Sequence, residues 1–168
     1  MSHRLAPQYQ FETLTGLVTR ISGDCLFKLG SRHESGGAGL SMSLEDYALF
    51  ADAMACGGVG KSGERILSSA SIDLMRKNQL SDRLLEQFRK MGISRGIGYG
   101  LGAAVYTDST AACTLVPDHS FYWGGAGGWQ NLIDPKNRLS YVVAQHTVGS
   151  PKHLFNPHML NALYGAMS

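Results

Sequence analysis

The spacing of apolar residues changes near residue 95 and divides the chain into two kinds of pattern. Before that point apolar residues recur every three or four positions over several stretches, which is typical of amphipathic helices. After it, short apolar runs alternate with glycines and turn residues, which indicates strands joined by tight connections. A final apolar pattern is again helical. This order predicts an α+β fold, with an antiparallel sheet flanked by helices.

Four helices are expected from these patterns. The first follows Ser43, whose spacing to Asp46 resembles a capping box, and Gly57-Gly58 ends it. A second begins near Ser69 or Ser71 and runs through Met75. The third is marked by apolar residues from 84 to 91 and is stopped by a glycine, and the last covers 154–167.

The strands are expected mainly in the second half of the chain. One glycine-rich strand is predicted over 98–107, and three more near 119–124, 128–133 and 139–147. Asp134-Pro135-Lys136-Asn137 has the composition of a turn and predicts a hairpin between the last two. A looser alternation over 8–30 predicts one or two short hairpin strands.

The bulk composition indicates a globular chain and excludes several classes of function. The 168 residues are 43% hydrophobic and 17% charged, enough for a single domain over 1–168. The net charge of +2 is scattered, so a nucleic-acid partner is not expected. No apolar run reaches the length of a membrane segment or a signal peptide. Three separated cysteines predict buried or partly buried free thiols in a reducing, cytoplasmic setting.

Two glycine-rich stretches resemble nucleotide-binding loops without fitting them. Residues 55–62 would match a phosphate-binding loop only with Ala55 in place of glycine, and they follow a helix where the motif requires a strand. Residues 96–102 place Leu101 at the third glycine of the dinucleotide fingerprint. The six histidines show no metal-ligand spacing, so neither a metal nor a cofactor is implied.

The most informative stretch is Phe121–Pro135 together with the apolar run at 139–147. An aromatic strand here meets a cluster of glycines, Gly124-Gly125-Ala126-Gly127-Gly128, before a second strand begins. Glycines at such a place allow a ligand or another backbone to lie close to the strand. An ordinary sheet with a bulge is the alternative.

These motifs resemble those of the class C β-lactamase and esterase group of serine hydrolases. Trp123-Gly124-Gly125 matches the Trp-x-Gly form of the strand that lines the active site in that family, followed by a hairpin with Asp-Pro at its turn. Further segments agree in order, and they are 4–9, 36–50, 65–75 and 98–102. The resemblance covers residues 4–147, and it implies the C-terminal portion of a β-lactamase-like domain.

The resemblance also assigns roles and exposes a gap. It assigns the backbone N–H of Ala126 as a hydrogen-bond donor to the oxyanion. It also implies that Trp123, Gly124 and Gly125 bind the substrate. For Trp123 the alternative is a role in core packing. The family's Ser-x-x-Lys nucleophile and Tyr-x-Asn do not occur in this sequence. We therefore expect a fragment that lacks the N-terminal strands and the serine-bearing helical region and is inactive alone. Its complete enzyme would act on a small ester, amide or β-lactam.

A second hypothesis is a non-catalytic module that keeps this part of the fold for binding or oligomerisation. Without the family's first strands, residues 139–147 would form an open apolar edge, which predicts a homodimer through that strand. A nucleotide-binding protein acting through Lys61 is the least favoured alternative.

Overall fold

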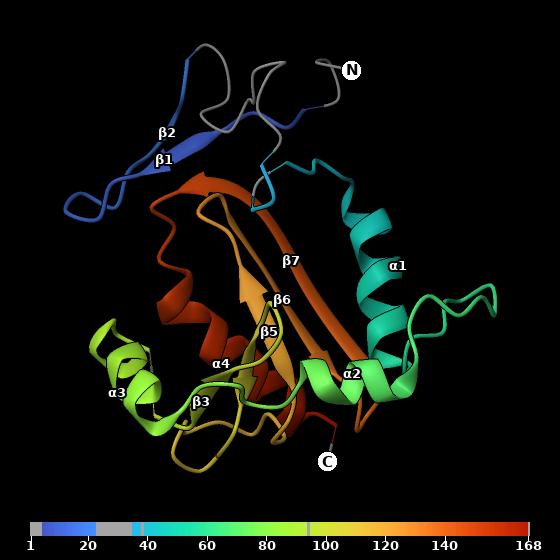
Figure 1. Ribbon diagram of the computed structural model, residues 1–168. Coiled ribbons are helices and arrows are strands. Elements are labelled where there is room, and N and C mark those ends of the chain that lie inside the picture. Colours follow the sequence, from blue (N-terminus) through green and yellow to red (C-terminus); the bar gives the residue numbers. More distant parts are fainter. Residues whose placement is uncertain (1–4, 23–34, 38, 94, 168) are drawn as a thin grey trace.

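The computed structural model describes residues 5–22, 35–37, 39–93 and 95–167 (Figure 1). Seven strands and four helices follow one another in this part of the chain. Their order is β1 Tyr9–Phe11, β2 Val18–Arg20, α1 Leu44–Ala55, α2 Ser69–Met75, α3 Asp82–Lys90, β3 Ile97–Tyr99, β4 Ala104–Tyr106, β5 Phe121–Gly124, β6 Gly128–Asp134, β7 Leu139–Val148 and α4 Lys152–Gly165. The α+β class predicted from the sequence is confirmed.

The strands form a seven-stranded sheet in the order β2-β1-β7-β6-β5-β4-β3. Neighbours from β7 to β3 pair antiparallel, as the sequence predicts for consecutive strands with short connections. The exception is β1, which pairs parallel to β7 through Tyr9 with Thr147 and Gln10 with Val148. The sheet is therefore mixed, and the prediction of a purely antiparallel sheet is wrong at this point.

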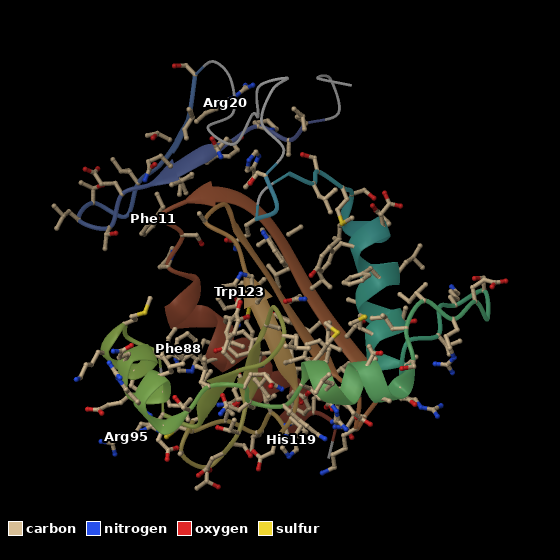
Figure 2. All side chains as sticks on the ribbon, in the orientation of Figure 1. Phe11, Arg20, Phe88, Arg95, His119 and Trp123 are labelled. Atoms are coloured by element: carbon tan, nitrogen blue, oxygen red, sulfur yellow. The ribbon has the colours of Figure 1, made fainter. Side chains whose placement is uncertain are left out.

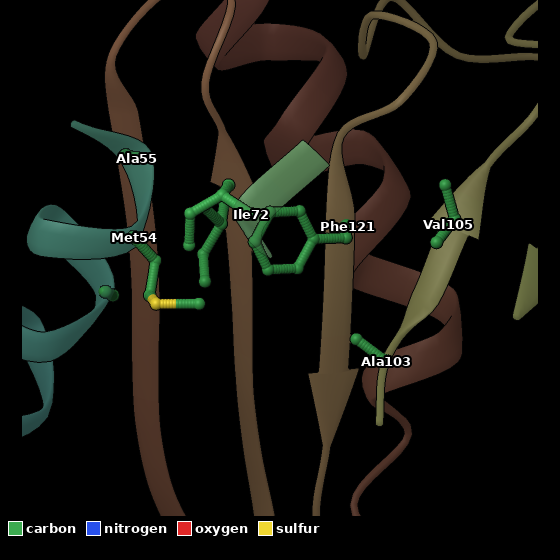
Figure 3. Close-up of a cluster of buried hydrophobic side chains, with 8 residues drawn as sticks. Met54, Ala55, Ile72, Ala103, Val105 and Phe121 are labelled. Carbon is green, nitrogen blue, oxygen red and sulfur yellow. The ribbon is translucent and has the colours of Figure 1, made fainter. Parts of the chain in front are cut away.

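Helices cover both faces of the sheet, and each face contributes to its own core. α1 and α2 lie on one face, where Met54 and Ile72 pack against Val105, Phe121 and Ile133 (Figure 3). α4 lies on the opposite face, where its Leu160 and Tyr164 pack against Leu132 and Val116. Neighbouring residues of one strand, such as Leu132 and Ile133, enter different cores because side chains alternate across a strand.

α1 begins where its capping residue predicts, and α2 also begins after a capping serine. Ser43 caps α1 by accepting a hydrogen bond from the Asp46 N–H at 3.1 Å, and Ser68 caps α2 in the same way. Gly57 and Gly58 adopt positive φ angles directly after α1. Residues 55–62 thus form the end of a helix, in agreement with the interpretation of this stretch as a helix-stop loop.

The prediction of one strand over 98–107 is wrong, because the chain turns back within it. β3 and β4 pair antiparallel, and the Gly100 N–H donates to the Ala103 carbonyl at 2.8 Å to close the turn between them. Gly102 has a φ of 80°, a conformation that glycine adopts without steric cost. Composition alone does not distinguish such a reversal from a continuous strand.

β7 has a partly protected edge. Between the pairs Gly128–His146 and Gln130–Val143, β7 advances three residues while β6 advances two, so β7 carries a bulge. The ring nitrogen Nδ1 of His146 lies 2.9 Å from the Ala6 carbonyl and fastens the segment before β1. β1 pairs with residues 147–148 only, which leaves the outer edge over 139–143 without a paired strand among the described residues.

The described cysteines carry free thiols, and Cys25 lies outside the described residues. Cys56 is partly buried, as expected, whereas Cys113 is exposed, because it sits in the loop between β4 and β5 with a φ of 54°. Among the described residues, every helix falls short of the length and apolarity needed to cross a bilayer.

Candidate active site

The glycine cluster forms the turn of the β5–β6 hairpin. The Gly128 N–H donates to the Gly125 carbonyl at 3.0 Å, and the Gly125 N–H donates to the Trp129 carbonyl at 3.0 Å. The Thr147 N–H binds the Gly127 carbonyl at 2.6 Å, which ties the turn to β7. Ala126 is exposed at the outer side of this turn, and its N–H makes no hydrogen bond to the residues that the structure describes.

Gly125 provides the space for the indole of Trp129. A Cβ atom at this position would overlap Nε1 and Cδ1 of the ring, so only glycine fits beneath it. The ring is held on its other side by Tyr47 of α1, with centroids 5.1 Å apart in an edge-to-face arrangement. Gly125 therefore joins the turn to α1 through Trp129.

We expect Gly125→Ala to displace the Trp129 ring and to destabilise the fold by about 1–3 kcal/mol, the usual cost of overpacking. Urea unfolding would measure the loss of stability, and near-ultraviolet circular dichroism would report the ring. Gly36→Ala is the matched control, because a Cβ there meets no atom within 4 Å. Equal stabilities of the two variants would contradict the packing described for Trp129.

Asn131 is a buried polar side chain that links three elements. It is 7% exposed and lies opposite Trp123 in the β5–β6 pairing. Its Oδ1 accepts from the Trp123 N–H at 2.7 Å, and its Nδ2 donates to the Tyr47 hydroxyl at 2.7 Å. Burial raises the pKa of Tyr47, so this hydroxyl stays protonated at neutral pH. The amide thereby fixes the end of β5 relative to α1.

Asn131→Leu is expected to cost about 2 kcal/mol, because it leaves the Trp123 N–H and the Tyr47 hydroxyl without their partner. Asn131→Asp restores both hydrogen bonds, since a carboxylate accepts from the N–H and from the hydroxyl. Chemical denaturation of both variants checks the loss. If the leucine variant is as stable as the natural chain, the amide does not hold these elements together.

Trp123 takes part in a row of three aromatic rings, here called the aromatic row: Trp123, Tyr99 and Phe88. Its two ends, Trp123 and Phe88, are labelled in Figure 2. Trp123 meets Tyr99 edge to face at 5.3 Å, and Tyr99 meets Phe88 at 5.8 Å in the same manner. Trp123 is 42% exposed and belongs to neither core. The structure thus places an accessible aromatic surface two residues before the turn that carries Ala126.

The residues singled out in the sequence lie together on this one hairpin. Two of their partners belong to its second strand, β6, and the others come from α1, β3 and α3. Asn131, Tyr47 and Trp129 were not predicted as parts of the site, and neither were Tyr99 and Phe88. Helical spacing placed Tyr47 on the buried side of α1, yet no local pattern could show that it meets Asn131 across 84 positions. An open groove of about 510 Å³ lies between β1–β2 and the end of β7, and none of the predicted site residues lines it.

The fold is β-lactamase-like, as the motifs implied. EstCE1, a hydrolase with promiscuous acyltransferase activity, superposes with a TM-score of 0.76 at 23% identity. Simvastatin synthase LovD from Aspergillus terreus superposes with a TM-score of 0.78 at 19% identity. No protein-family model and no curated protein matches the sequence.

The superpositions cover nearly all of this chain but less than half of its structural neighbours. They include 98% of this chain in both cases, against 44% of EstCE1 and 43% of LovD. At these sequence identities the likeness defines the fold. The activity of the neighbours enters only as support for a proposal.

Proposed function

We propose that this chain is part of a serine hydrolase that transfers acyl groups from small esters, amides or β-lactams, and that it is inactive by itself. The observation that carries the proposal is the combination of a shared fold with a missing nucleophile. The chain spans about 44% of EstCE1, and Ser-x-x-Lys and Tyr-x-Asn do not occur in its sequence. A serine hydroxyl reacts only when a neighbouring base activates it, so this sequence by itself lacks the covalent step known for that fold.

In this proposal the β5–β6 hairpin supplies electrostatic stabilisation. The exposed N–H of Ala126 would donate to the oxyanion that forms when the nucleophile attacks the carbonyl carbon, and Trp123, Gly124 and Gly125 would bind the substrate beside it. A single donor of this type contributes about 3 kcal/mol when the rest of the site is present. Hydrogen bonds on both sides of Ala126 brace the turn, so the donor is held in place before substrate binds.

The proposal is tested by comparing the chain alone with a longer product of the same gene that includes the coding segment upstream of Met1. We expect the chain alone to show neither turnover nor a covalent adduct by intact mass with p-nitrophenyl acetate and nitrocefin. The longer protein should turn over and be acylated on the serine of a Ser-x-x-Lys motif. An acyl adduct on a serine of the present chain, or an upstream segment without that motif, would contradict the proposal.

Ala126→Pro isolates the contribution of the N–H in the longer protein. Proline removes this donor, and it suits the position because Ala126 is the second residue of the turn closed by Gly125 and Gly128. We expect kcat to fall by about 100-fold or more, while Ala126→Ser, which keeps the N–H, retains most of the activity. Equal activity of the two variants would remove Ala126 from the oxyanion site.

The alternative function is a non-catalytic module that assembles through β7. β7 contains no Asp, Glu, Lys or Arg over its ten residues, and β1 pairs only with its end. Uncharged strand edges recruit other strands, whereas an edge lysine prevents pairing. The bulge near residue 144 limits the available edge to 139–143.

In this alternative the chain forms a homodimer, and Ala144→Lys is expected to convert it into a monomer because a lysine at the end of the pairing edge introduces a charge that opposes strand pairing. Ala144 is exposed, so the substitution leaves the cores intact. Light scattering coupled to size exclusion measures the mass, with Ala111→Lys on an exposed loop as the control. A concentration-independent monomer for the natural chain would exclude this assembly.

A further inference from the structure

The aromatic row joins two rings on hydrogen-bonded strands and one ring on a helix that buries no residue. Tyr99 belongs to β3, and its N–H donates to Asn78 Oδ1 at 3.1 Å while its carbonyl accepts from the Gln79 N–H at 2.8 Å. The backbone of Trp123 is held by Asn131. Phe88 lies on α3, a helix in which no residue is buried. The backbone at the first two rings is thus held by hydrogen bonds, and Phe88 extends their surface from α3.

The side of α3 that bears Phe88 is apolar and only partly covered. Leu84, Phe88 and Met91 lie at positions i, i+4 and i+7, so they share one face of the helix. Leu84 and Met91 are exposed, although Phe88 contacts Tyr99. The charges of α3 lie on other faces, where Glu86 and Lys90 form an ion pair at 3.4 Å. A ligand that contacts this side of α3 therefore meets the uncharged side chains of Leu84, Phe88 and Met91.

The aromatic row begins close in sequence to the β5–β6 turn that carries Ala126. This position indicates which part of a substrate would reach the row. Trp123 is both the end of the aromatic row and the third residue before Ala126. A carbonyl bound at the Ala126 N–H would therefore direct one of its substituents along the row. Edge-to-face rings favour flat partners, because a planar group can complete the same packing pattern.

We propose that Phe88 and Tyr99, together with Trp123, determine specificity for a neutral ester whose acyl group is flat and apolar, such as an ester of an aromatic carboxylic acid. The inference rests on the proposed function, because it names the substrate class of that same site. Phe88 closes the far end of the row. Short acyl groups such as acetyl would leave Tyr99 and Phe88 without a contact.

The experiment measures binding of methyl 2-naphthoate and of methyl acetate to the chain as it exists, by tryptophan fluorescence and by saturation-transfer NMR. We expect saturable quenching by the naphthoate alone, lost in Trp123→Phe. Phe88→Ala should weaken binding about fivefold, the usual effect of one aromatic pair. Leu115→Ala, which truncates an exposed apolar residue in the loop between β4 and β5, should leave the affinity unchanged.

Phe88 lies outside both cores, so Phe88→Ala is expected to fold, and its thermal unfolding curve verifies this. No binding of the naphthoate, or equal affinities of the natural chain and Phe88→Ala, would overturn the inference. The outcome is separate from that of the proposed function. A longer protein that hydrolyses acetyl and naphthoyl esters equally well would retain the function and refute the specificity. Naphthoate binding without turnover in the longer protein would retain the specificity and refute the proposed function.

Discussion

Asp134→Ala is expected to lower the free energy of unfolding by about 3 kcal/mol, because removal of this fully buried carboxylate would leave four hydrogen-bond donors without an acceptor. Asp134 is 0% exposed. It accepts from the N–H groups of Lys136 and Asn137 at 2.9 and 3.2 Å and from the Asn137 side-chain amide at 2.7 Å. The fourth donor is the Tyr164 hydroxyl of α4 at 2.7 Å. This one side chain shapes the β6–β7 turn and attaches the last helix.

Urea unfolding of three further variants identifies the cause of the loss. Asp134→Asn keeps the volume and one acceptor oxygen, so an intermediate stability is expected. Tyr164→Phe removes only the contact with α4 and should cost about 1–2 kcal/mol. Asp73→Ala is the control, because Asp73 is half exposed and forms a surface ion pair with Arg76, which contributes at most about 1 kcal/mol. If Asp134→Ala is no less stable than Asp73→Ala, the buried carboxylate does not stabilise the fold.

Stability is expected to fall steeply above about pH 10, the ordinary pKa of tyrosine. Burial raises the pKa values of Tyr106 and Tyr164 far above this value, and it raises that of Tyr122 to about 12. The hydrogen bond to Asp134 raises the pKa of Tyr164 further. Tyr164 belongs to the core between α4 and the sheet, and Tyr106 and Tyr122 pack against this core with their rings 5.1 Å apart.

The sign follows from the proton balance of the two states. Below pH 10 these tyrosines are protonated in both states and contribute no pH dependence. Above it the unfolded chain releases protons that the folded chain retains, so each tyrosine lowers stability by about 1.4 kcal/mol per pH unit until its folded pKa is reached. Urea titrations between pH 9 and 12 should reveal the decline. Tyr122→Phe should reduce the slope by one tyrosine's share, and an unchanged slope would show that Tyr122 is not responsible.

The boundaries of α1 and the start of α2 could be predicted from sequence because their signals are local. Ser43, Ser68 and the glycines after α1 act within one turn of the residues they cap. The Asp-Pro turn before β7 was predictable for the same reason. The reversal inside 98–107 was not, since a glycine-rich run is compatible with both a strand and a turn.

Only some of the residues of the candidate site could be predicted from local sequence patterns. Trp123, Gly124, Gly125 and Ala126 are adjacent in sequence, and their clustering identified the hairpin. Their binding and catalytic roles stay predictions that the experiments above test. Residues that approach the hairpin from α1, β3 and α3 left no sign in the local pattern, because contacts between distant elements depend on how the sheet is assembled.

The sequence by itself determined the α+β class, the Asp-Pro turn before β7 and the absence of Ser-x-x-Lys, since each depends on residues within a few positions of one another. Only the tertiary structure decided that β1 joins β7 in parallel, that Asn131 bridges Trp123 and Tyr47, and that Phe88 extends the aromatic row. The physical reason is that these contacts are selected by shape and hydrogen bonding between surfaces. Those surfaces exist only after the helices and the sheet have packed together.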